Sequence, residues 1–70
     1  MIRFTTKNSK YEVTVQKNQF HVKKFEAINP ESTALVVGQT TVSDYLELSI
    51  GRGAQFGGKI TSAVVAIEDL

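Results

Sequence analysis

The residues of this chain whose types and spacing could do chemistry lie between positions 51 and 59. This segment holds four of the five glycines, together with Arg52, Phe56 and Lys59. Residues 53–59 match the pattern G-x-x-x-x-G-K, the first part of a phosphate-binding loop. In such a loop, backbone N–H groups surround the phosphates and the lysine contacts them. The spacing therefore raises the question of a nucleotide site.

Three features argue against nucleotide hydrolysis at this segment. Ile60 stands where the motif needs a serine or threonine to hold Mg²⁺. The residues that follow are β-branched, whereas the mechanism needs a helix whose N-terminus faces the phosphates. Only about eleven residues follow Lys59, too few for the parallel sheet that such enzymes require. We therefore predict that residues 51–59 form a long hairpin loop between two strands.

A simpler anion or nucleotide site at the same loop stays open as an alternative. Glycine-rich segments expose backbone N–H groups that can bind an anion, and Arg52 and Lys59 flank this one. Phe56 would then lie at the tip of a mobile loop as a stacking or docking ring. In the other interpretation, Phe56 folds back onto the core.

A second candidate surface is basic. Residues 1–24 carry six basic side chains and one acidic side chain, a charge of +5, whereas residues 25–70 carry two basic and six acidic ones, a charge of −4. Such asymmetry can mark a surface that binds nucleic acid. Binding of this kind usually adds stacking aromatic rings, but here the rings fall on the apolar side of the predicted strands. The side chains on this face are Arg3, Lys7, Lys10, His21 and Lys23.

Catalysis and metal binding have no support in the composition. His21 is the single histidine and the chain contains no cysteine, so a zinc-type ligand set cannot be assembled. No serine stands in the context of a nucleophile elbow. We predict no enzyme activity, no cofactor and no metal. The absence of cysteine, and of any apolar run of about 18 residues, predicts a cytoplasmic protein that does not cross a membrane.

Three strands account for the first 24 residues. Apolar and polar residues alternate with period two at positions 2–7, 11–16 and 20–23, as in half-buried strands. Two-residue loops at 8–9 and 17–18 would pair Phe4 with Val13, and would pair Val13 in turn with Val22. This register places the apolar residues on one face of an antiparallel meander.

The rest of the chain is less regular. Residues 29–32 surround Pro30 and are typical of a turn, and residues 34–37 form a short apolar run that suits a buried strand. Residues 42–50 fit helical and strand spacing equally, and we predict a strand. The apolar run at 60–67 predicts a last strand that is covered on both faces.

These elements predict one domain over residues 1–70. We expect an all-β fold, a small barrel or roll of five to six short, mainly antiparallel strands that opens with a three-stranded meander. A chain of this size buries a small core, and a subunit interface could add to it. A homo-oligomer is therefore one of the expectations.

Two short fragments carry a resemblance to known proteins. Residues 6–13 fit a T-x-N-S-x-Y-x-V pattern and residues 61–65 fit T-S-x-V-V. Together they resemble short uncharacterised β-rich proteins of bacteriophages and prophages, over about 13 residues. The resemblance implies a small accessory or inhibitor protein that acts by binding, and it transfers no site residues.

The function expected from the sequence is therefore non-catalytic binding. The first hypothesis is a phage-type accessory or inhibitor protein that contacts a protein partner or its own copies. The alternatives are a nucleic-acid-binding domain that uses the basic face, and a nucleotide- or anion-binding protein that uses residues 51–59.

Overall fold

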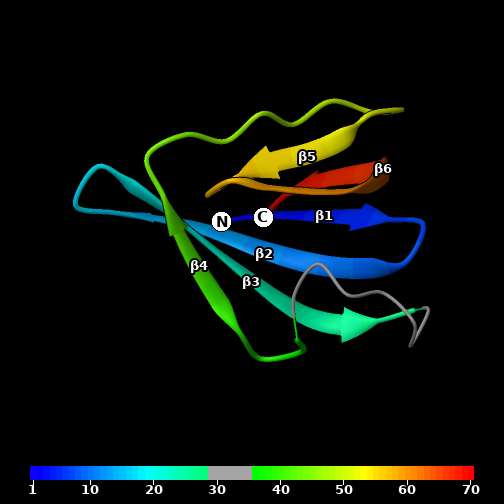
Figure 1. Ribbon diagram of the computed structural model, residues 1–70, viewed down its shortest axis with the longest axis horizontal. Coiled ribbons are helices and arrows are strands. Elements are labelled where there is room, and N and C mark those ends of the chain that lie inside the picture. The colour runs from blue at the N-terminus through cyan, green and yellow to red at the C-terminus, as the bar shows by residue number, and fades with distance from the viewer. Residues whose placement is uncertain (29–35) are drawn as a thin grey trace.

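The computed structural model describes residues 1–28 and 36–70. In these residues six antiparallel strands form one nearly closed, barrel-like sheet with the order β4-β3-β2-β1-β6-β5 (Figure 1). The described part of the chain contains no helix, and the prediction of a small all-β barrel is confirmed. The strands are β1 (Ile2–Thr6), β2 (Ser9–Gln16), β3 (Gln19–Ala27), β4 (Thr40–Ser43), β5 (Gly53–Phe56) and β6 (Lys59–Asp69).

The second hairpin of the meander has the predicted register. Val13 pairs with Val22 in the β2–β3 ladder. The loop at Lys17 and Asn18 has positive φ angles of 52° and 63°. Positive φ at both central residues is the signature of a type I′ turn, whose twist matches that of the flanking strands. The loop residues therefore fix the register.

The first hairpin differs from the prediction by two residues. Phe4 pairs with Tyr11 instead of Val13, so the two-residue loop lies at 7–8 and not at 8–9. A shift of two residues keeps every side chain on its predicted face, because successive side chains of a strand alternate between faces. The alternation of apolar residues therefore predicted the faces correctly but could not distinguish these two registers.

Hydrogen bonds of the Thr6 side chain explain why the first turn lies at residues 7–8. Its Oγ1 accepts the backbone N–H groups of Asn8 and Ser9 at 3.2 and 3.1 Å and donates to the Ser9 carbonyl oxygen at 3.2 Å. Thr6 and Ser9 are both buried. Local hydroxyl-to-backbone bonds of this kind stabilise a tight turn, and they hold it between Thr6 and Ser9.

Two β-bulges change the direction of side chains. In β3, Lys24 pairs with Tyr11 and Glu26 pairs with Lys10, so Phe25 between them is the extra residue. Lys24 precedes the bulge, points into the barrel by ordinary alternation from Val22 and is only 2% exposed. The bulge instead places Glu26 on the outer face, opposite Lys10. In β6, Val65 is the extra residue opposite β1. A bulge bends its strand, and here it lets β6 pair with β5 in its first half and with β1 in its second.

Aromatic rings form the centre of the core. Phe4 and Tyr11 stack with ring centroids 4.8 Å apart, and Phe56 meets Tyr11 edge-on at 6.2 Å. Such ring pairs add about 0.5–1.5 kcal/mol each beyond the burial of area. Burial also raises the pKa of the Tyr11 hydroxyl, and its hydrogen bond to Ser9 acts in the opposite direction. The other buried apolar residues are Val13, Val22, Ala54 and Val64.

The segment between β3 and β5 differs from the prediction at two places, residues 34–37 and residues 42–50. The predicted turn at 29–32 and the first half of the predicted strand at 34–37 lie outside the described residues. Val36 and Val37 are 73% and 51% exposed and lead into a turn at Gly38, so they do not belong to a buried strand. In the predicted strand 42–50, only the first two residues are in β4, and Glu47 and Ile50 make isolated bridges. The rest is neither helix nor continuous strand.

The glycine-rich segment is also not the predicted loop. Gly53–Phe56 is β5, and the turn into β6 consists of Gly57 and Gly58 alone. The strand predicted at 60–67 is confirmed and is longer, as β6. Its predicted coverage on both faces is wrong, because Val65 and Ile67 are 52% and 42% exposed.

Candidate functional site

Phe56, predicted as one of three binding residues with Arg52 and Lys59, belongs to the core. Its side chain is fully buried and packs edge-on against Tyr11. Of the two interpretations left open by the sequence, the structure shows the one in which the ring folds back onto the core. Phe56 is therefore not an exposed docking ring.

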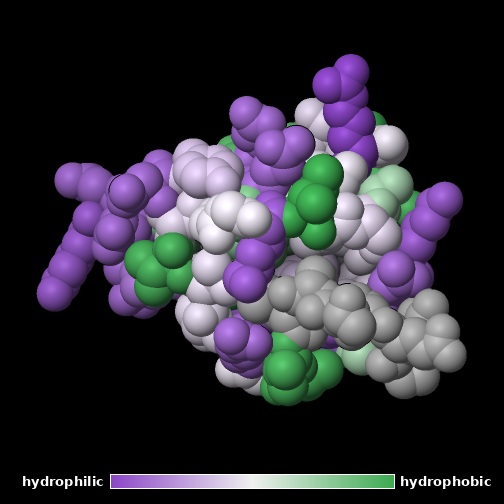
Figure 2. Space-filling model, in the orientation of Figure 1, coloured by the Kyte–Doolittle hydropathy of each residue, from purple (hydrophilic) through white to green (hydrophobic). Residues whose placement is uncertain are grey.

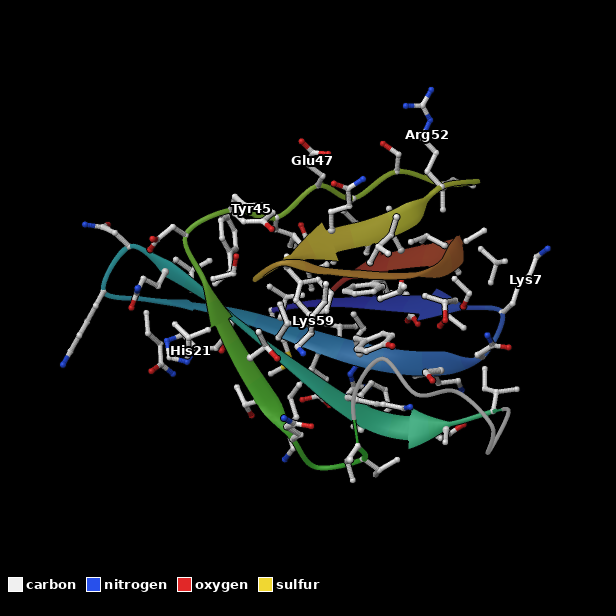
Figure 3. All side chains as sticks on the ribbon, viewed as in Figure 1. Lys7, His21, Tyr45, Glu47, Arg52 and Lys59 are labelled. Carbon is white, nitrogen blue, oxygen red and sulfur yellow. The ribbon has the colours of Figure 1, made fainter. Side chains whose placement is uncertain are left out.

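The two cations of the same predicted site lie at opposite ends of the β5–β6 hairpin (Figure 3). The Arg52 carbonyl oxygen accepts the N–H of Val64, whereas Lys59 lies beside the turn and pairs with Phe56. Five residue steps along β6, from Lys59 to Val64, separate these positions, which is about 16 Å at the usual rise of a strand. Arg52 shares a shallow hollow of about 360 Å³ with the Glu47 carboxylate. The structure does not bring Arg52 and Lys59 together around one anion.

Six backbone N–H groups of residues 51–59 already have acceptors. The N–H of Gly57 donates to Ser43 Oγ at 2.9 Å, and the N–H of Gly58 donates to Tyr45 Oη at 2.8 Å. An anion-binding loop needs N–H groups that point to a free space. Intramolecular acceptors also bind the N–H groups of Gly51, Arg52, Ala54 and Gln55.

These contacts show what the turn glycines do in the fold. We call the contact of Ser43 and Tyr45 with Gly57 and Gly58 the barrel closure. Gly57 has a φ of +54°, and a Cβ atom there would lie 2.7 Å from Thr41 Cγ2. A glycine is therefore required by both the backbone angle and the space. The barrel closure joins the end of β4 to the β5–β6 turn.

The second predicted surface, the basic face, is paired with carboxylates. Arg3 forms an ion pair with Glu12 at 3.1 Å, and its guanidinium carbon lies 5.2 Å from the centre of the Phe25 ring. Lys10 contacts Glu26 at 3.5 Å. Glu12 lies opposite Lys23. These carboxylates offset the positive charge that a nucleic acid would need.

The remaining basic residues do not extend this face into a continuous patch. Lys7 and His21 lie at opposite ends of the molecule (Figure 3). Lys23 and His21 line a hollow of about 220 Å³ that also contains Glu12. The predicted residues are thus present on the surface, but the structure intersperses them with acidic groups.

The surface that the sequence did not identify is an edge of β6. Residues 65–70 are all exposed. β5 pairs only with the first half of β6, up to Ala63, and Ile50 makes a single bridge at Val64. Beyond Val64, none of the described strands pairs with β6 on the side opposite β1. We call residues 65–69 of β6, on this side, the open edge.

The hydrogen bonds of β6 with β1 determine which backbone groups face the open edge. Met1 and Leu70 exchange both backbone hydrogen bonds, at 3.3 and 2.8 Å. In an antiparallel ladder such pairs recur at every second residue, so Glu68 and Ala66 also point to β1. The N–H and C=O groups of Ile67 and Asp69 therefore point away from β1.

An apolar hollow adjoins the open edge. It has a volume of about 500 Å³ and lies where the β2–β3 hairpin projects beyond the ends of β1 and β6. Asp69 belongs both to its wall and to the open edge. On the face shown in Figure 2, hydrophilic side chains gather at the left, over the β2–β3 turn of Figure 1, and hydrophobic side chains form separate patches. The apolar residues that line the hollow are Met1, Ile2, Val13, Val15 and Phe20.

The two outer strands of the sheet, β4 and β5, are each partly covered. Glu47 exchanges two backbone hydrogen bonds with Gln55, at 2.9 and 3.0 Å, and so covers the edge of β5. Gly57 packs against Thr41 and Ser43 beside β4. Natural β proteins usually cover or charge their edges because an unpaired edge recruits other strands. No described strand covers the open edge in this way.

The described residues contain neither a cluster of metal ligands nor a membrane-spanning helix. Among residues 1–28 and 36–70, no three or more histidine, aspartate or glutamate side chains gather closely enough to hold a metal ion. No helix in the same residues is long and apolar enough to cross a membrane. Comparisons of the chain with protein-family models, curated proteins and solved structures found no match.

Proposed function

We propose that this chain is a non-catalytic binding protein that accepts an extended segment of a protein partner as an added strand at the open edge. The single observation that carries the proposal is the exposed stretch of β6 at residues 65–69, with which none of the described strands pairs on the side opposite β1. Strand addition uses main-chain hydrogen bonds for affinity and alternate side chains for specificity.

The composition of the open edge supports a protein partner. Val65 and Ile67 are 52% and 42% exposed, and β-branched side chains favour pairing with another strand. Asp69 lies on the open edge and also lines the apolar hollow. A partner strand on the open edge would therefore reach the hollow and could place an apolar side chain beside Val15 and Phe20. Glu68 and Asp69 favour a partner with basic residues near the pairing segment.

An accessory or inhibitor role in the cytoplasm accords with this surface. The two fragments that resemble small bacteriophage proteins support an accessory protein that acts by contact. The absence of cysteine is typical of proteins in a reducing compartment. Nucleic-acid and anion binding have less support, since Arg3 and Lys10 are paired with glutamates and the glycine N–H groups have acceptors.

The proposal can be tested with a synthetic peptide of alternating valine and threonine that carries a lysine at each end. Its binding is followed by the backbone amide resonances of the ¹⁵N-labelled protein. We expect the largest shifts at Ile67 and Asp69, whose N–H groups face the open edge. Shifts confined to residues 51–59 or to the basic face, or no shifts, would contradict the proposal.

Two variants of Asp69 separate the hydrogen bond from the charge. Asp69→Pro removes the N–H that faces the open edge, and proline is tolerated where that group points to solvent. We expect it to weaken peptide binding at least about fivefold, the loss of one hydrogen bond of about 1 kcal/mol. Asp69→Ala keeps the N–H and should retain most of the binding at moderate salt. Equal binding by all three proteins would contradict strand addition.

A further inference from the structure

The geometry points to a second copy of this chain as the occupant of the open edge, in an antiparallel β6–β6 pairing with a two-fold axis at Ile67. This inference rests on the proposed function and names its partner. A two-fold contact must be self-complementary, because each residue i that meets j is matched by a j that meets i. Two identical antiparallel strands satisfy this condition when the axis passes through one residue.

The hydrogen-bond pattern selects Ile67 as that residue. Its N–H and C=O point away from β1, since the exchanged bonds between Met1 and Leu70 set the alternation. With the axis at Ile67, the N–H of each Ile67 donates to the C=O of Ile67 in the other copy. An axis at Glu68 would instead present groups that are already bonded to β1.

The side chains also fit this register. The two Ile67 side chains, each 42% exposed, lie opposite each other. Glu68 lies opposite Ala66 of the second copy, and Asp69 lies opposite Val65 of the second copy. No two carboxylates face each other directly, whereas like charges at directly opposite positions would destabilise the pair.

The segment before β5 limits the pairing and adds a charge contact. Gly51 and Arg52 already occupy the edge of β6 at Val64 through bonds of 2.8 and 2.9 Å. The strand of the second copy therefore pairs only beyond Val64, with its Asp69 adjacent to Arg52. Ile50, 60% exposed, lies at the same place and would contact Leu70 of the second copy. Both contacts occur twice by symmetry.

A cysteine at the axis provides a sharp test, because the chain contains no other cysteine. Opposite residues in a hydrogen-bonded antiparallel pair have Cα atoms about 5.5 Å apart, within the range of about 4.4–6.8 Å that a disulfide accepts. Ile67→Cys should therefore form a disulfide-linked dimer under mild oxidation. Asp69→Cys is the matched control, since its two copies would lie about 14 Å apart and should not cross-link.

Mixing two variants tests the register independently. Val65→Cys and Asp69→Cys proteins should cross-link with each other more than either does with itself. Melting temperatures confirm that each variant folds. Failure of Ile67→Cys to cross-link, or equal cross-linking of Ile67→Cys and Asp69→Cys, would overturn the inference.

Charge exchange tests the contact of Arg52 with Asp69. Arg52→Asp or Asp69→Arg alone should weaken self-association by up to about thirtyfold, because an exposed ion pair of up to about 1 kcal/mol is lost at both of its two symmetric positions. The combined Arg52→Asp, Asp69→Arg protein should recover the original association. Absence of recovery would overturn this register.

Sedimentation at protein concentrations from about 10 µM to about 1 mM, the range of weak association, distinguishes failure of this inference from failure of the proposed function. The inference predicts that the mass rises towards that of a dimer. A monomer at every concentration that still binds the valine–threonine peptide overturns the second copy as occupant and leaves the proposed function intact. A monomer that binds no peptide overturns both.

Discussion

The barrel closure and the open edge are two parts of one sheet that treat unpaired backbone groups in opposite ways. At the barrel closure, Ser43 and Tyr45 accept the N–H groups of the turn glycines. At the open edge, the groups of Ile67 and Asp69 point away from β1 and no described strand pairs with them. The difference teaches that the glycine-rich segment serves the fold, whereas the apolar strand that follows it carries the surface that we propose for binding.

The largest expected effect is that of removing the Phe56 ring from the core. Phe56→Ala should lower the free energy of unfolding by about 3–5 kcal/mol, because a buried ring is replaced by a cavity. Arg52→Ala, the neighbouring exposed control, should change it by less than about 0.5 kcal/mol. Urea unfolding measures both. A change below about 1 kcal/mol for Phe56→Ala would show that the ring does not stabilise the core.

A methyl group at Gly57 should have the next largest effect. Gly57→Ala places a Cβ 2.7 Å from Thr41 Cγ2 at a φ of +54°, which should cost about 3 kcal/mol from strain and crowding together. Gly58→Ala is the matched control, with a φ of +76° and no atom within 4 Å, and should cost about 1 kcal/mol.

The crowding part of this cost can be isolated. Thr41→Ser removes the methyl group that the new Cβ would meet, so Gly57→Ala should be less destabilising in the Thr41→Ser background than in the original protein. Thermal unfolding of the four proteins gives the coupling between the two positions. Strict additivity would contradict the close approach at the barrel closure.

Loss of the Ser43 hydroxyl should destabilise the protein by about 1–2 kcal/mol. Its Oγ accepts the N–H groups of Gly57 at 2.9 Å and Tyr45 at 3.2 Å, and Ser43→Ala leaves both without this acceptor. Ser49→Ala, at an exposed position, should change stability by less than about 0.5 kcal/mol. Equal effects of the two variants in chemical denaturation would contradict the role given to Ser43.

Alkaline pH should lower the stability of the folded protein through ionisation of the buried Tyr11 hydroxyl. Burial raises the pKa of Tyr11 above its usual value of 10.0, so the folded state holds the proton more tightly than the unfolded state. Its contribution to stability is complete below pH 10 and is lost as the pH rises through the raised pKa. In unfolding experiments at rising pH, Tyr11→Phe should lose less stability than the original protein. An identical decline in both would contradict this assignment.

The smallest effect on stability is expected at the open edge. Val65→Lys changes a side chain that is 52% exposed and should alter the free energy of unfolding by less than about 0.5 kcal/mol. A lysine at a strand edge discourages pairing, so the same variant should reduce self-association. A variant that unfolds the protein, or that associates as before, would contradict the separation of the two regions.

Much of the fold follows from local patterns in the sequence. Alternation at positions 11–16 and 20–23, together with the turn at Lys17 and Asn18, gives the β2–β3 register correctly. The bulges at Phe25 and Val65 could not be predicted in this way, because they interrupt the alternation and depend on partner strands. The position of the first turn depends on hydrogen bonds of the Thr6 side chain, which select one of two registers that differ by two residues.

The site was harder to predict than the fold, for a physical reason. Residues 51–59 resemble a phosphate-binding loop in composition, but whether their N–H groups are free depends on Ser43 and Tyr45, which are distant in the sequence. The basic face likewise depends on Glu12 and Glu26 across the strands. The apolar run at 60–67 marks the strand that carries the open edge, but such a run equally predicts a strand covered on both faces. An unpaired edge is a property of sheet topology.

Amide hydrogen exchange along β6, measured at increasing protein concentration, tests the central claim most directly. In dilute protein, the Glu68 amide, which bonds to β1, should be protected, whereas the Ile67 and Asp69 amides should exchange rapidly. As the concentration rises, protection should appear at Ile67 and Asp69 as the open edge becomes paired. Protection of Ile67 and Asp69 in dilute protein, or rapid exchange at every concentration, would contradict the account.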